Sequence, residues 1–136
     1  MKLALLILWV ALCAFVVATG YIRLAPTDPD DWDVPLDFSD DSDEGGIRRV
    51  VETGPDGLAR LDPIIRATPR TRLLAGGVAE GRATYVTRSA VIGFPDYTTV
   101  EQDGDVLKIF ARQRFGRSDF GVNETRVTGW LNALQP

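Results

Sequence analysis

The longest hydrophobic run of the chain lies at its N-terminus, where the twenty residues from position 3 to position 22 carry no charge. At about 1.5 Å of rise per residue, a helix of this length matches the roughly 30 Å hydrocarbon core of a bilayer. Tyr21 and Arg23 at its far end are typical of the boundary between membrane and water. The pattern therefore predicts an uncleaved transmembrane anchor over residues 1–23.

Two other interpretations of this run stay open. Lys2 supplies the positive region of a secretory signal peptide, and Val16-Val17-Ala18 offers a small-residue cleavage site before Thr19. Alternatively, Cys13 is the lipidated residue of a lipoprotein, although Leu12 before it is bulkier than usual. For the anchor we expect a single-pass protein of the inner (cytoplasmic) membrane, with its domain in the periplasm of a Gram-negative host.

After residue 46 the spacing of apolar residues becomes that of a small folded domain. Leu58, Leu61, Ile64 and Ile65 recur at helical spacing, and Pro69 marks the end of this helix. A second helix is predicted at the C-terminus, where four apolar residues share one face: Val127, Trp130, Leu131 and Leu134.

Between these helices the pattern is typical of short β-strands. The predicted strands cover residues 71–74, 84–92, 97–101 and 106–112, with turns over 75–77 and 93–96. Asp103-Gly104 is a strong signal for a hairpin between the last two strands. The predicted fold class is α+β, a small antiparallel sheet of about four strands with helices on one face, preceded by an N-terminal transmembrane helix.

The distribution of charge separates the same parts of the chain as the hydrophobic pattern does. Nine acidic residues and no basic one lie between positions 24 and 44, whereas residues 45–136 carry 13 basic and 10 acidic residues. We therefore expect an acidic linker over residues 24–46 and a mildly basic domain over 47–136. The linker is either an extended, self-repelling spacer or a segment that docks on the domain through Trp32 and Phe38.

The amino-acid composition excludes several kinds of catalytic and metal-binding site. The chain has no histidine and one cysteine, which excludes a Ser-His-Asp or Cys-His nucleophile pair, a Cys/His zinc site and an internal disulfide. Asp41, Asp43 and Glu52 echo the spacing of a calcium loop, but the fifth place lacks an oxygen ligand and no helix precedes it. We interpret that pattern as coincidence and expect no metal and no cofactor.

The last predicted strand directs two arginines to the face opposite the core. Alternation sends Leu107, Ile109 and Ala111 toward the helices, and Arg112 and Arg114 to the other face. Guanidinium groups beside a helix N-terminus are suited to an anion. The candidate ligand- or partner-binding residues on and beside this surface are Arg112, Arg114, Arg117, Ser118, Asp119 and Asn123, with Arg88 and Asp96.

A purely structural interpretation of the same residues stays open. Asp119 can pair with one of the two arginines, and Ser118 or Asn123 can cap the following helix. A catalytic role would need Asp96 or Asp119 as a general base, and nothing in the spacing demands one. The net charge of +3 over residues 45–136 is weak for nucleic-acid binding, which we do not expect.

The C-terminal motif reads Arg112-x-Arg114-x-Gly116-x-Ser118-Asp119-x-Gly121-x-Asn123-x-x-Arg126. It resembles the signature of a bacterial and plastid family, the domain-of-unknown-function family number fourteen-ninety-nine. The resemblance extends over most of residues 21–134. It includes Pro69-Arg70-Thr71, Arg88, Phe94-Pro95-Asp96, Trp130-Leu131 and the segment between Tyr21 and Trp32.

The resemblance implies a membrane-anchored domain whose anchor is not cleaved, because the similarity runs from the anchor into the linker. It implies no activity, substrate or cofactor. Gln113 and Phe115 stand where members often have serines, and Asp33 lies near the place of a histidine. A role that depends on those groups would therefore not carry over to this chain.

Three functions follow from these observations. The leading hypothesis is a non-catalytic binding module for an anionic small molecule or protein partner. The second is a structural partner of a larger membrane complex, with the acidic linker as its contact surface. The third, which the sequence favours least, is a hydrolase or transferase that uses Asp119.

Overall fold

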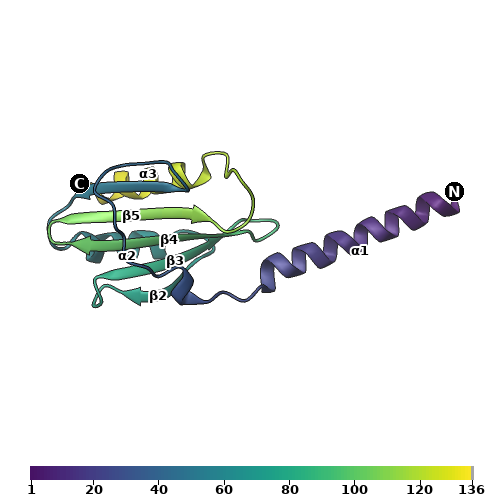
Figure 1. Ribbon diagram of the computed structural model, residues 1–136, viewed down its shortest axis with the longest axis horizontal. Coiled ribbons are helices and arrows are strands. Elements are labelled where there is room, and N and C mark those ends of the chain that lie inside the picture. The colour runs from purple at the N-terminus through teal and green to yellow at the C-terminus, as the bar shows by residue number, and fades with distance from the viewer. Residues whose placement is uncertain (136) are drawn as a thin grey trace.

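One antiparallel sheet of five strands organises the chain, in the order β1-β5-β4-β3-β2 (Figure 1). The computed structural model describes residues 1–135. Helices α2 (Gly57–Arg66) and α3 (Val122–Leu134) cover one face of the sheet, and α1 (Lys2–Leu24) extends away from it. The α+β class predicted from the sequence is confirmed. The strands are β1 (Ile47–Glu52), β2 (Thr71–Gly77), β3 (Arg82–Arg88), β4 (Pro95–Asp103) and β5 (Val106–Gln113).

The hydrophobic core lies between the sheet and helices α2 and α3. Leu107, Ile109 and Ala111 of β5 are fully buried in it, as the alternation along that strand predicts. The helices contribute five buried residues to the same core: Leu58, Leu61, Ile65, Val127 and Trp130. Because the helices fill this face, the arginines and lysine that alternate with the core residues of β5 point to the opposite face.

Three predicted boundaries were wrong. The turn expected over 93–96 is shorter, because Pro95 and Asp96 already belong to β4. Residues 75–77, expected to form a turn, belong to β2, whose pairing with β3 shifts at a bulge between Leu73 and Ala75. The predicted strand over 84–92 ends at Arg88. Ser89 turns the chain there, because its hydroxyl accepts hydrogen bonds from the backbone amides of Gly93 and Phe94.

Strand β1 is not among the strands predicted from the sequence. It pairs antiparallel with β5 along its whole length, from Ile47 opposite Ala111 to Glu52 opposite Val106. None of its residues is fully buried. An edge strand of this kind carries polar side chains on one face and along its open edge, so it lacks the apolar alternation that marks the inner strands.

Residues 25–46, here called the strap, cross the face of the sheet that the helices leave open. The indole ring of Trp32 stacks on the ring of Tyr97, with centroids 3.9 Å apart. Leu36 is buried to 4% exposure, and Phe38 packs edge-on against a phenylalanine of β5. The structure therefore has the docked arrangement of the linker, not the free spacer.

Polar contacts complete the attachment of the strap. The Asp33 carboxylate accepts a hydrogen bond from the buried Thr84 hydroxyl at 2.8 Å and pairs with Arg82 at 3.3 Å. Arg112 donates to the carbonyl oxygen of Trp32 at 2.6 Å, and Arg114 donates to that of Pro26 at 2.9 Å. Basic and hydroxyl groups of the sheet thus bind the strap along much of its length.

Helix α1 stands outside the packed domain, and none of its residues is buried. By length and composition it can cross a membrane, properties that an anchor and a signal sequence share. Its last turn touches the domain: Arg23 Nε donates to the carbonyl oxygen of Ile92 at 2.8 Å, and Tyr21 lies edge-on to Phe115 with ring centroids 6.2 Å apart. The helix therefore leaves the domain beside the loops over residues 89–94 and 114–121 (Figure 1).

Candidate functional site

Several elements meet at the end of the sheet from which α1 departs. Strands β3 and β5 end there, and β4 and α3 begin there (Figure 1). Two cavities of about 580 and 670 Å³ lie side by side at this end. Four lining residues belong to both: Arg70, Arg88, Ser89 and Ala90.

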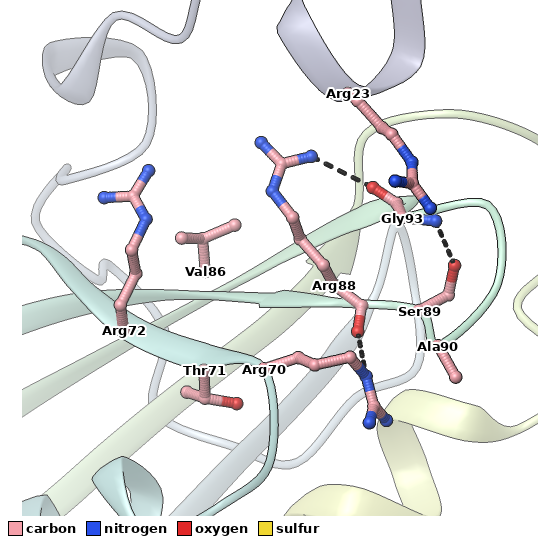
Figure 2. A pocket seen from close by; sticks show the side chains of 9 residues that line it. All are labelled: Arg23, Arg70, Thr71, Arg72, Val86, Arg88, Ser89, Ala90 and Gly93. Atoms are coloured by element: carbon pink, nitrogen blue, oxygen red, sulfur yellow. Dashed lines mark hydrogen bonds between the residues drawn. The ribbon is translucent and has the colours of Figure 1, made fainter. Parts of the chain in front are cut away.

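Four arginines line the smaller cavity, here called the arginine pocket: Arg23, Arg70, Arg72 and Arg88. They come from the last turn of α1, from the start of β2 and from the end of β3. Figure 2 shows the guanidinium groups of Arg23, Arg72 and Arg88 on the same side of the strands, whereas that of Arg70 points to the other side. The fold thus brings together cations that lie up to 65 positions apart in the sequence.

No carboxylate of residues 1–135 lies within 4.0 Å of these four guanidinium groups. Their hydrogen bonds within the chain go to backbone carbonyls: Arg88 Nη1 donates to Gly93 at 2.9 Å, and Arg70 Nε to Arg88 at 3.0 Å. Each guanidinium has five N–H donors, so these bonds use a minority of them. The remaining donors can bind a ligand or water, and no carboxylate of the described residues offsets the positive charge.

The larger cavity combines a buried ion pair with aromatic walls. Asp96 and Arg126 form a pair at 3.3 Å, and each side chain is 14% exposed. Burial raises the pKa of Asp96, an effect that Arg126 opposes and the nearby Asp119 charge reinforces. Phe94, Phe115 and Phe120 line the same cavity. The negative charge of Asp96 is offset by its partner Arg126. It therefore does not compensate the positive charge of the arginine pocket.

Asp119 caps helix α3. Its carboxylate oxygens accept hydrogen bonds from the backbone amides of Gly121 at 3.0 Å and Asn123 at 2.9 Å. Burial by itself would raise the pKa of Asp119, but the hydrogen bonds from the amides outweigh it and hold the pKa below its ordinary value. The sequence predicted that Asp119 could pair with Arg112 or Arg114, while Ser118 or Asn123 capped this helix. In the structure Asp119 itself supplies the cap, and it forms no ion pair with an arginine of the described residues.

Replacing Asp119 with alanine is expected to lower the free energy of unfolding by about 1 kcal/mol, because two amides of the helix start lose their acceptor. Asp119→Asn should keep most of the stability. Since the folded-state pKa is lowered, the carboxylate contributes fully above the ordinary carboxyl pKa, and the contribution disappears as the pH falls through the folded value. Chemical unfolding of the full chain in detergent measures both effects. An unchanged free energy of unfolding in Asp119→Ala at neutral pH would contradict the capping role, and a loss that persists at acid pH would contradict the contribution of the charge.

The sequence-predicted site residues separate into three groups. Arg88, Asp96, Ser118 and Asp119 line the larger cavity. A further cavity of about 400 Å³ beside Gly46 is lined by a second set of residues: Arg112, Arg117, Ser118, Asp119 and Asn123. Arg114 lies apart from both sets and is bonded to the strap. The face that Arg112 and Arg114 share is therefore covered by the chain's own residues 25–46.

Sequence analysis missed three members of the arginine pocket: Arg23, Arg70 and Arg72. One signal could have indicated the last two. Between Asp62 and Glu80 the chain carries three basic residues and no acidic one, so local sequence offers these arginines no partner. Arg23, by contrast, was interpreted as an interfacial residue of the helix, and only the fold brings it beside β2 and β3.

Comparison with protein-family models decides the family. The model described as "Protein of unknown function (DUF1499)" matches residues 25–134. The chain belongs to this family. Comparison with curated proteins and with solved structures gives no match.

The DUF1499 match begins at the first residue after α1 and ends with the last residue of α3. It therefore includes the strap, which the charge pattern had set apart as a linker, within the same family domain as the sheet. Contacts of Trp32 and Leu36 with the sheet agree with that extent. The match confirms the resemblance derived from the C-terminal motif, while α1 lies outside it.

Proposed function

We propose that this DUF1499 protein is a membrane-anchored, non-catalytic binding module for an anionic ligand, which it holds in the arginine pocket. One observation carries the proposal: four arginines line one cavity, three of them with their guanidinium groups on the same side of the strands, and no carboxylate of the described residues neutralises them. Guanidinium groups are planar, permanently charged and matched to the oxygen pairs of phosphate and carboxylate groups. Like charges gathered at one place repel one another, and a bound anion relieves that repulsion.

The proposal includes α1 as the anchor, in a single pass, with the domain on the periplasmic side of the inner membrane. Its support is the exposure of α1: none of its residues is buried, and only its last turn contacts the rest of the described chain. A bilayer removes such a surface from water, and a helix of 23 residues is long enough to span it. The alternative of a cleaved signal sequence predicts a mature protein that is extracted without detergent.

The test is thermal unfolding of the full chain in detergent micelles with inorganic phosphate, organic phosphates and acidic peptides. A ligand at a hundred times its dissociation constant stabilises the folded state by about 2.7 kcal/mol. We expect stabilisation by at least one of these anions and its loss in Arg72→Gln. Arg72 is exposed and its side chain donates no hydrogen bond within residues 1–135, so the substitution leaves the fold intact.

Arg60→Gln is the matched control. Arg60 is an exposed arginine of α2 that pairs with Asp56 at 3.2 Å and lies outside the arginine pocket. Its variant should bind the same anion with unchanged affinity. Stabilisation that survives in Arg72→Gln, or a flat response to every anion, would overturn the proposal. A flat response would favour the assembly-partner hypothesis, for which crosslinking in native membranes is the next experiment.

A further inference from the structure

The arginine pocket lies at the level where α1 enters the domain. Arg23 is both a residue of the last turn of α1 and a wall of the pocket. In Figure 1 the loop between β3 and β4 and the loop between β5 and α3 reach the same end of the molecule as the last turn of α1. If α1 crosses a bilayer, these two loops and the pocket face the surface of that bilayer.

Exposed apolar side chains lie in the two loops at this end of the domain, outside the lining of the arginine pocket. Val91, at the tip of the loop between β3 and β4, is 80% exposed, and Phe120, before α3, is 94% exposed. Phe120 also has a positive φ of 53°, a conformation that is unfavourable for a bulky side chain. Phe94 and Val122 are exposed as well. Residues of this kind beside basic ones are typical of surfaces that contact lipid headgroups and the outer acyl region.

We infer that the anion of the arginine pocket is the phosphate group of an anionic phospholipid in the bilayer that holds α1. The inference rests on the proposed function, and it adds the source of the anion. Arg23, Arg72 and Arg88 contact the headgroup, while Val91 and Phe120 enter the interfacial layer. Two loops thereby bind the domain to the membrane surface, in addition to the anchoring helix.

Charge at this end of the domain agrees with a lipid partner. The two carboxylates that line the larger cavity are already used, because Asp96 pairs with Arg126 and Asp119 caps α3. The arginines therefore face an anionic surface without an opposing charge of their own. A free phosphate would satisfy the guanidinium groups equally well, but it would leave the exposed Val91 and Phe120 in water. A phospholipid accounts for both sets of side chains.

The test uses the full chain with Cys13→Ala, which removes the sole cysteine, and Val91→Cys carrying an environment-sensitive fluorophore. The protein is reconstituted in nanodiscs of phosphatidylcholine alone or mixed with phosphatidylglycerol, and quenching by nitroxide-labelled lipid reports docking of the loop. We expect docking that requires phosphatidylglycerol and weakens at high salt. Arg72→Gln should reduce the ratio of docked to undocked protein about fivefold, the contribution of one basic residue near an anionic surface.

Arg60→Gln, remote from this end, should leave docking unchanged. Docking of equal strength in phosphatidylcholine alone, or docking that Arg72→Gln does not weaken, would overturn the lipid headgroup as the ligand. A label that stays undocked in both nanodiscs, while inorganic phosphate stabilises the chain in an Arg72-dependent manner, overturns the lipid source and leaves the proposed function standing. If none of the anions tested above stabilises the chain either, both proposals fall together.

Discussion

Trp32→Ala is expected to release the strap from the sheet and to lower the free energy of unfolding by about 3 kcal/mol, the lower end of the range for removing a large aromatic side chain. The indole stacks on Tyr97, and its backbone carbonyl accepts hydrogen bonds from Arg112 and Thr99. Without the ring, Tyr97 loses its cover and the strap loses its largest contact. Chemical unfolding of the full chain in detergent, followed by circular dichroism, measures the loss of stability.

Limited proteolysis provides a second, local measurement. The strap holds nine acidic residues, so a protease that cleaves at acidic positions should cut Trp32→Ala far faster than the parent chain. Val34→Ala is the control, because Val34 lies in the same strap with its side chain exposed and should change stability by less than about 0.5 kcal/mol. Equal cleavage rates for the parent chain and Trp32→Ala would show that the strap is held by contacts other than the indole.

Much of the domain could be predicted because its periodic patterns are local. The helical spacing of Leu58, Leu61 and Ile65 and the alternation of Leu107 and Ile109 each describe a face that packs against the core. Such faces are specified by neighbours within a few positions. The signal was weakest at the edge of the sheet, where β1 has no fully buried residue and so no strict alternation.

The strap and the arginine pocket depend on contacts between distant residues. Nine acids mask the few apolar side chains that attach the strap, so the sequence favoured an extended spacer and left docking as the alternative, whereas in the structure Trp32 stacks on Tyr97. In the arginine pocket, Arg23 lies near Arg72 and Arg88, because the chain turns at the end of α1. The sequence did indicate that Arg112 and Arg114 share a face, but not that the chain itself covers that face.

Arg112→Ala is expected to lower the free energy of unfolding by about 2 kcal/mol. The Arg112 guanidinium lies over the rings of Trp32 and Phe110, at 5.2 and 4.4 Å from their centroids, and donates to the Trp32 carbonyl and the Thr99 hydroxyl. Burial, together with the nearby positive charge of Arg48, lowers its pKa to about 10, so it remains a cation at neutral pH. The variant loses two charged hydrogen bonds and two cation–π contacts, whose combined contribution exceeds the cost of desolvating the cation.

A double-mutant cycle separates this contact from the general effect of truncating a side chain. Trp32→Ala and Arg112→Ala should together destabilise the chain by about 1 kcal/mol less than the sum of the two single variants, because each removes the same contact. Arg112→Lys should not restore stability, since an ammonium lacks the planar group that both lies over the rings and donates to the carbonyl. Arg60→Ala, which breaks an exposed pair on α2, should change stability by less than about 0.5 kcal/mol and combine additively with Trp32→Ala. If the Trp32 and Arg112 variants proved additive as well, Arg112 would not stabilise the chain through the indole ring, and its contribution would come from its hydrogen bonds and its contact with Phe110.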